Sequence, residues 1–130
     1  MAINFNKESI FNLTPISKND VRQEVTRLLV NGEEIIYAFK TIRDQLLFTN
    51  KRIIAIDVQG ITGKRKEFTT LPYSKIQFFS VQTPAFMEII SDSELFIMFA
   101  DGFTAKFEFK DSKVDIIGDI ARIISEFILW

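Results

Sequence analysis

Histidine and cysteine are both absent from this chain of 130 residues. Without cysteine there is no disulfide bond and no thiolate metal site, and without histidine most nucleophilic and transition-metal mechanisms lose their usual residues. Serine and threonine are present, but no partner base for them is apparent in the sequence. We therefore expect a protein that is not an enzyme, with no catalytic residue, no metal and no cofactor.

Long apolar segments and a strong net charge are also missing. No run approaches about 18 apolar residues, the length that suggests a membrane-spanning helix. Residues 1–13 lack the basic start and the long apolar segment of a signal peptide. The formal net charge is −1, whereas nucleic-acid-binding proteins usually carry a concentrated basic surface. These absences predict a soluble, cytoplasmic protein that does not bind nucleic acid.

Phenylalanine is the residue in excess, with 14 copies against one tryptophan and two tyrosines. Large flat side chains pack well on the faces of β-sheets, so the expected core is built from strands. The length fits a single domain, and no linker, internal repeat or low-complexity segment divides the chain.

Short apolar runs separated by turn residues organise the sequence as an antiparallel meander. Seven strands are predicted, at residues 33–40, 45–49, 52–59, 67–73, 75–83, 94–100 and 103–109. The apolar residues of the strand at 75–83 change parity near Phe78, which predicts a β-bulge there. The last strand alternates most regularly, and we expect its inward side chains to be Phe103, Ala105, Phe107 and Phe109.

Two helices are predicted, one before the strands in the sequence and one after them. Residues 17–30 carry an apolar stripe and begin at Ser17, a residue that can cap a helix N-terminus. Residues 111–129 form a closing helix, and Gly118 within it suits a close approach of the helix backbone to a strand. Residues 1–16 are expected to be irregular, and the apolar connection at 85–93 to fold over one end of the strands.

Together these elements predict a mainly β (α+β) fold. It is a bent, seven-stranded antiparallel barrel, capped by a C-terminal α-helix and preceded by an additional N-terminal helix. The predicted domain spans residues 1–130, divided into an extension (1–16), a helix (17–30), the barrel (33–109) and the capping helix (111–129).

Four motifs resemble those of the bacterial pleckstrin-homology (PH) domain family. They recur in that family's order and spacing, and they are IRD at 42–44, LFTNKRII at 47–54, DVQGITGK at 57–64 and PYSKI at 72–76. The likeness extends from residue 17 to the closing helix. It implies a PH-like barrel, a cytoplasmic non-enzymatic module, and assembly into homo-oligomeric rings. The phosphoinositide site of eukaryotic PH domains does not carry over, because the hairpin at 40–44 has only Lys40 and Arg43, beside the acidic Asp44.

Basic residues gather in two predicted turns. Because consecutive turns of a meander lie at opposite ends of the sheet, Lys51 is separated from this cluster, and we do not expect a membrane lipid as a partner. The alternative function is a module that uses this cluster to bind an anionic ligand or a membrane surface, and the other interpretation of the cluster is a solvated hairpin tip. The candidate anion-binding residues are Lys40, Arg43, Lys64, Arg65 and Lys66.

Acidic residues offer no convincing metal site. Their spacings match no calcium-binding loop, and the best-placed pair, Asp115 and Asp119, reads as the solvated edge of a helix. The residues considered were Asp92, Glu94, Asp101, Asp111, Asp115 and Asp119.

Two predicted strands are apolar on both faces, although a small barrel needs only one apolar face per strand. The extra faces predict a surface for self-association, with a homo-oligomer, expected to be cyclic, as the main partner and another protein as a further one. The alternative is that the two helices and the N-terminal tail cover these faces. The candidate interface residues are Ile54, Ile56, Val58, Phe96 and Met98.

Overall fold

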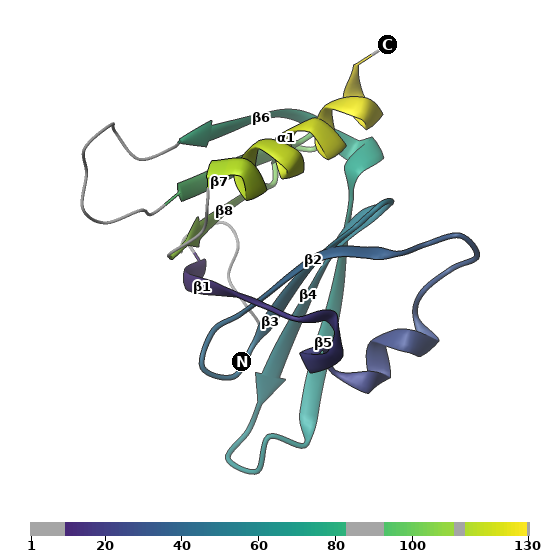
Figure 1. The fold of residues 1–130 in the computed structure, drawn as a ribbon, viewed down its shortest axis with the longest axis vertical. Helices are drawn as coiled ribbons and strands as arrows, with labels where there is room; N and C mark the ends of the chain where they lie inside the picture. The colour runs from purple at the N-terminus through teal and green to yellow at the C-terminus, as the bar shows by residue number, and fades with distance from the viewer. Residues whose placement is uncertain (1–9, 83–92, 111–113, 130) are drawn as a thin grey trace. The chain divides into compact units, whose positions relative to one another are not determined.

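The computed structural model describes residues 10–82, 93–110 and 114–129. These residues form eight β-strands, one α-helix and three short 3-10 helices (Figure 1). The chain divides into two compact units, the first comprising residues 15–72 and the second comprising residues 10–14 with the described residues from 73 onward. A mainly β chain that ends in an α-helix is therefore confirmed, but the predicted number of seven strands is wrong. The predicted connection at 85–92 and the helix start at 111–113 lie outside the described residues.

The first unit contains a four-stranded antiparallel sheet in the order β2-β3-β4-β5. Its strands are β2 (Ile35–Lys40), β3 (Gln45–Thr49), β4 (Arg52–Gln59) and β5 (Arg65–Pro72). The bounds of β3 and β4 are those predicted, and β5 begins two residues earlier than predicted. The Asn50-Lys51 turn and the turn at 60–64 separate these strands as expected.

One face of this sheet carries a buried hydrophobic cluster of the first unit. Its buried cluster consists of Val25, Ala38, Leu47, Ile54 and Ile56. Val25 comes from the segment before β2, so that segment lies over the sheet and closes the cluster. Half-buried apolar residues complete the packing, and they are Ile16, Val21, Leu29, Ile35 and Phe68.

The predicted α-helix at residues 17–30 is wrong. The segment instead forms two 3-10 helices, η1 (Lys18–Asp20) and η2 (Gln23–Arg27), with Val21 and Arg22 in extended conformation between them. The side chain of Gln45 explains the break, because it accepts a hydrogen bond from the Arg22 backbone N–H (3.0 Å) and donates one to the Asp20 carbonyl (2.9 Å). These two bonds to the sheet replace bonds that a continuous helix would make within itself.

The second unit contains strands in the order β1-β8-β7-β6. They are β1 (Ile10–Ile16, whose last two residues belong to the first unit), β6 (Ile76–Gln82), β7 (Ser93–Phe99) and β8 (Thr104–Phe109). Residues 10–16 were expected to be irregular, and this is wrong, because β1 pairs with β8 in parallel. The sheet is therefore not antiparallel throughout. β1, the strand that the prediction lacked, pairs with a strand almost a hundred residues away in the sequence.

Register confirms the bulge predicted near Phe78, because the pairing of β6 with β7 shifts between Ile76 and Phe78. The alternation predicted for β8 also holds. Ala105, Phe107 and Phe109 are buried, while Phe103, just before the strand, is half-buried.

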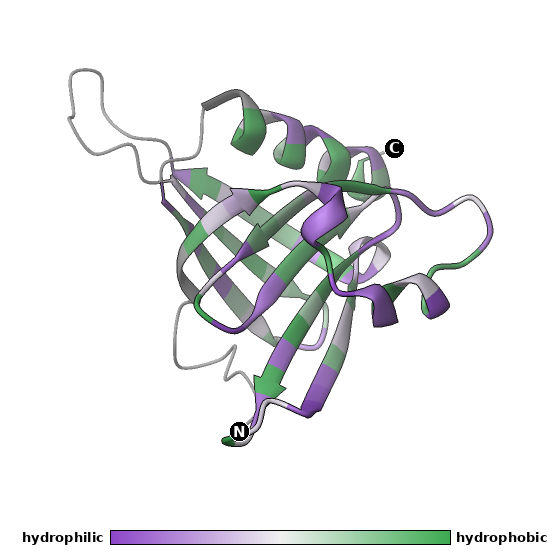
Figure 2. Cartoon of the chain, turned by 60° about the horizontal axis from the view of Figure 1, so that its bottom comes forward, coloured by the Kyte–Doolittle hydropathy of each residue, from purple (hydrophilic) through white to green (hydrophobic). Residues whose placement is uncertain are grey.

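The closing helix α1 (Val114–Ile128) packs against β6, β7 and the short helix η3 (Tyr73–Lys75) (Figure 1). Its hydrophobic and hydrophilic residues alternate along the coil (Figure 2), and Ile117, Ile120 and Ile124 are buried. The expected close approach at Gly118 is absent, because no atom of a neighbouring described element lies within 4 Å of the position that a Cβ would take.

Candidate functional site

The two turns that carry the predicted anion-binding residues lie at one end of the first unit (Figure 1). The Arg43 guanidinium, in the β2–β3 turn, donates a hydrogen bond through Nη2 to the carbonyl of Gly60, in the β4–β5 turn. Arg22 Nη2 in turn donates to the Arg43 carbonyl (3.2 Å), so the segment before β2 is tied to the same end. The structure thus brings the two turns together, although Arg43 serves to hold them.

The other four candidates differ in their surroundings. Lys66 forms an ion pair with Glu24 of η2 (Nζ to Oε2, 3.1 Å). Lys40, Lys64 and Arg65 are exposed. Five cations therefore gather at one end, and Arg43 and Lys66 are bonded to other parts of the chain.

Two carboxylates lie beneath this basic surface. Asp44 accepts a hydrogen bond from the Val58 backbone N–H (Oδ1, 2.9 Å), and Asp57 is buried and accepts from Gln59 Nε2 (3.2 Å). Burial raises the pKa of Asp44, and the charge of Asp57 acts in the same direction, while the Val58 N–H acts against them. These carboxyls offset part of the positive charge, which disfavours a deep anion-binding pocket at this end.

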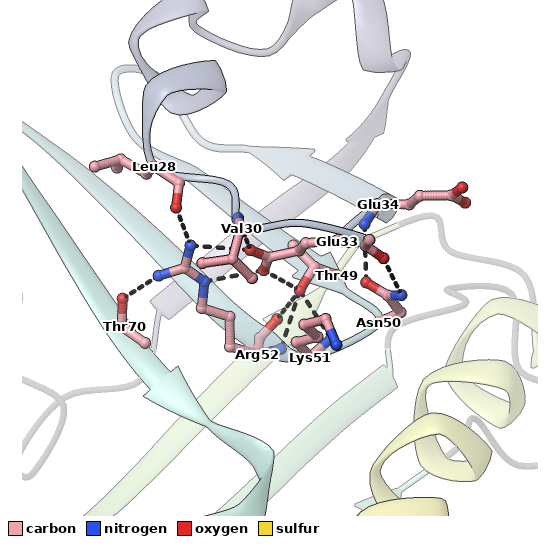
Figure 3. A network of polar contacts seen from close by, with 10 residues as sticks. Leu28, Val30, Glu33, Glu34, Thr49, Asn50, Lys51, Arg52 and Thr70 are labelled. Carbon is pink, nitrogen blue, oxygen red and sulfur yellow. Dashed lines mark hydrogen bonds and ion pairs between the residues drawn. The ribbon is translucent and has the colours of Figure 1, made fainter.

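A buried ion pair dominates the opposite end of the first unit (Figure 3). Arg52 Nε and Nη2 donate to the Glu33 carboxylate (2.9 and 3.0 Å), whose side chain is fully buried. The same guanidinium reaches the Leu28 carbonyl (2.6 Å) and the Thr70 hydroxyl (2.9 Å). Burial raises the pKa of Glu33, but the hydrogen bonds from Arg52 and Thr49 outweigh it, so the pKa of Glu33 is lowered.

This network is structural rather than catalytic. The Thr49 hydroxyl donates to Glu33 Oε2 (2.6 Å) and accepts from the backbone N–H groups of Lys51 and Arg52 (both 3.0 Å). Glu33 Oε1 also accepts from the Val30 N–H (3.1 Å). With both carboxylate oxygens engaged, no group here is placed to transfer a proton to a ligand. The network fixes the chain entering β2 to the β3–β4 turn.

The predicted interface residues fall into two groups. Ile54 and Ile56 are buried in the cluster that Val25 closes, and Val58 is 8% exposed. Their face is covered by residues 17–30 of the same chain, which leaves almost no surface there for a partner. For this face, the structure agrees with the alternative given above, in which the N-terminal part of the chain covers the extra apolar surface.

Phe96 and Met98, by contrast, are half-buried on the other face of β7 from the buried Leu95 and Ile97. Register places Phe78 of β6 opposite Met98, and the rings of Phe78 and Phe96 lie 6.0 Å apart. Phe78 is 45% exposed. These three side chains form an apolar patch that is open to solvent in the described part of the chain, and we call Phe78, Phe96 and Met98 the β6–β7 patch.

Three exposed apolar residues, Phe78, Ile42 and Ile61, were not among the predicted site residues. Phe78 was assigned to the bulge, and its outward direction follows only from the register shift. Ile42 and Ile61, at the tips of the two basic turns, are 101% and 104% exposed. Their signal was in the sequence, because isoleucine is uncommon in the centre of a tight turn.

The described residues contain neither a metal-ligand cluster nor a membrane-spanning helix. No group of three or more acidic, histidine or cysteine side chains that could hold a metal ion occurs in residues 10–82, 93–110 and 114–129. Asp119 pairs with Arg122 of the same helix (3.2 Å). No helix in this part of the chain has the length and hydropathy needed to cross a bilayer.

Comparison with known proteins identifies the family. The family model for the bacterial PH domain matches residues 4–128. The chain belongs to the bacterial PH domain family. It is 37% identical over 114 residues to YjqA of Bacillus subtilis, which covers 88% of this chain and 90% of YjqA.

Solved structures agree with this bacterial PH domain assignment. A PH-domain protein from Shewanella loihica is 32% identical, with a TM-score of 0.67 over 91% of this chain and 98% of that one. A PH domain from Shewanella amazonensis is 33% identical, with a TM-score of 0.57 over 82% of this chain and 84% of that one. The resemblance carried by the four motifs is thereby confirmed, and with it the PH-like fold.

Proposed function

We propose that this bacterial PH domain is a non-enzymatic interaction module that assembles with further copies of itself into a closed, cyclic homo-oligomer. The observation that supports the proposal most strongly is strand β6, which combines an open edge with an outward apolar face. Members of this class of fold commonly serve as binding modules, and the lack of histidine and cysteine agrees with such a role.

The edge of β6 lacks the devices that usually prevent strand pairing. Among the described strands β6 is the last in its sheet and pairs only with β7. Natural edge strands are normally protected by lysine, proline or bulges. Residues Ile76–Gln82 contain no charged residue and no proline, and the single bulge, between Ile76 and Phe78, lies at the start of the strand.

The β6–β7 patch adds apolar area beside this edge. Phe78 continues it to the edge strand itself, and the ion pair between Lys106 and Glu94 (3.4 Å) lies on the same face. Three side chains are less than a standard interface, which buries about 800 Å² per partner. The backbone of β6 must therefore contribute as well, through hydrogen bonds to an added strand.

A second copy of the chain is the partner that these features favour. If β6 pairs with β6 of another copy, both open edges are satisfied at once, as in a two-fold symmetric contact. A ring of more than two copies needs one further contact. The exposed Phe127 and Leu129 at the end of α1 are candidates in the same unit, with exposures of 39% and 68%.

Sedimentation velocity on two matched variants tests the proposal. Phe78→Lys places a charge at the edge of the patch, and Val30→Lys places the same charge at an exposed apolar position (56%) in the first unit. We expect Phe78→Lys to sediment as a 15.1 kDa monomer, while Val30→Lys keeps the mass of the wild type. If both variants keep the mass of the wild-type oligomer, β6 is not the contact.

The second candidate, an anion-binding pocket built from the turns at 40–43 and 64–66, has less support. Arg43 is engaged with Gly60, and Lys66 with Glu24. A pocket would need these groups to change partners. A flat surface that attracts negative charge would not need Arg43 or Lys66 to change partners.

A further inference from the structure

Methionine supplies all the sulfur of this chain, because cysteine is absent. Of the three methionines, Met98 lies among the described residues, whereas Met1 and Met87 lie outside them. Oxidation of a thioether to a sulfoxide turns a flexible apolar side chain into a polar one. What this change does to a protein depends on whether the side chain belongs to the core or to a surface.

Met98 belongs to the outward face of β7. Burial alternates along this strand, and the buried side chains on the inward face are Leu95, Ile97 and Phe99. Met98 is half-buried on the opposite face. A polar group at this position therefore changes a surface and leaves the core packing of the second unit in place.

The neighbours of Met98 connect it to the open edge of the sheet. Register places Met98 opposite Phe78 of β6 and opposite Thr104 of β8. Phe78 is 45% exposed, and its ring centroid lies 6.0 Å from that of Phe96. A sulfoxide at Met98 would thus add an S–O dipole to the β6–β7 patch, on the strand next to the edge.

We propose that Met98 is a redox-sensitive modification site, where oxidation by hydrogen peroxide to methionine sulfoxide releases the contact between copies of the chain. This inference rests on the proposed self-association through β6 and the β6–β7 patch. The Met98 Sδ attacks one oxygen of the peroxide, the O–O bond breaks as the S–O bond forms, and the other oxygen leaves as water after proton transfer. Sulfur loses two electrons and the peroxide gains two. Methionine sulfoxide reductases catalyse the reverse change.

The proposed contact is sensitive to this change because it buries a side chain that the free subunit leaves half-open. In a two-fold contact both copies contribute Met98, so one contact would bury two sulfoxide groups. Burial of a polar group without a hydrogen bond is unfavourable, and we expect full oxidation to raise the dissociation constant at least about tenfold. Peroxide reaches Met98 in the free subunit, so oxidation should slow as the protein concentration is raised.

Treatment of the 130-residue wild-type chain with hydrogen peroxide tests the proposal, with peptide mass spectrometry to follow Met98 and sedimentation velocity to follow assembly. The untreated protein should be oligomeric. Conversion of Met98 to the sulfoxide should shift the population toward the 15.1 kDa monomer. Incubation with the two methionine sulfoxide reductases, one for each sulfoxide epimer, and dithiothreitol should restore the oligomer.

Met98→Leu is the matched control, because leucine preserves the apolar character and the approximate volume of the side chain. This variant retains Met1 and Met87, so an effect of oxidation at those positions would appear in it as well. We expect it to assemble as the wild type does and to keep its mass in peroxide. Met98→Gln places a polar group at the same position, and its dissociation constant should be raised about tenfold without peroxide.

The possible outcomes distinguish failure of this proposal from failure of self-association. An oligomer whose mass is unchanged after full oxidation of Met98 overturns the redox proposal and leaves self-association standing. Equal dissociation of the wild type and Met98→Leu in peroxide also overturns it, because the sensitive group then lies elsewhere. Loss of the circular dichroism signal on oxidation of Met98 would show that this residue supports the fold rather than the contact. A wild type that is monomeric before treatment overturns both proposals.

Discussion

Replacing Arg52 by methionine tests the role of the buried ion pair. Arg52→Met keeps the aliphatic stem but leaves the fully buried Glu33 carboxylate without its cation. Removing one partner of a buried pair costs about 3–5 kcal/mol. Because the Arg52 side chain is 17% exposed, water can reach part of the site, so we expect the lower end, about 3 kcal/mol. For a chain of this length that lowers the melting temperature by roughly 10 °C.

The pH dependence of this loss follows from the direction of the Glu33 pKa. In the wild type that pKa is lowered, so its contribution is present above the unfolded pKa and is lost as the pH falls through the folded value. Without Arg52, burial dominates and raises the pKa of Glu33. The stability of Arg52→Met should then fall as the pH rises through the Glu33 range, and its deficit should be smaller at about pH 4 than at pH 7.

Urea unfolding followed by circular dichroism at both pH values measures this. Lys51→Met is the matched control, because it removes an exposed neighbouring cation and should change stability by less than about 0.5 kcal/mol. The double variant Glu33→Gln/Arg52→Met should recover most of the loss, since no buried charge is left unpaired. A loss of less than about 1 kcal/mol in Arg52→Met, or an equal loss at the two pH values, would refute the reasoning.

The remaining predictions concern glycine and aspartate. Gly118→Ala should stabilise the protein by about 1 kcal/mol in urea unfolding, because the helical position is open and glycine is a poor helix former. Gly63→Ala should destabilise it by about 1–2 kcal/mol, because φ is +68° there and the added Cβ would lie 3.4 Å from Val58 Cγ1; equal effects of the two substitutions would contradict this account. Since burial raises the pKa of Asp44, the contribution of the protonated carboxyl to stability is lost as the pH rises through the pKa that Asp44 has in the folded state. Asp44→Asn should therefore be at least as stable as the wild type at pH 7, and a large loss there would show that the carboxylate charge is needed.

Local sequence signals were sufficient for the meander and the closing helix. The alternation in β8 and the turn residues between β3 and β4 fix those elements by themselves, and the change of parity around Phe78 located a bulge. Of the predicted stripe of Val21, Val25, Leu28 and Leu29, all but Leu28 pack on the hydrophobic cluster of the first unit, and Leu28 is exposed. What the stripe could not reveal is that Gln45, more than twenty residues later, breaks the helix by bonding its backbone.

Long-range pairing limited the rest. β1 exists because it pairs with β8, and nothing within residues 10–16 announces that partner. For the same reason the bonds of the basic residues could not be predicted, because the contacts of Arg43 with Gly60 and of Lys66 with Glu24 depend on the folded register. Ile54 and Ile56 were predicted to be surplus apolar surface because the sequence does not show that residues 17–30 cover them.

Light scattering on the purified wild-type chain at micromolar concentration tests the central proposal, self-association, most directly. The proposal predicts a discrete mass that is an integral multiple of 15.1 kDa. A monomer at that concentration would contradict it.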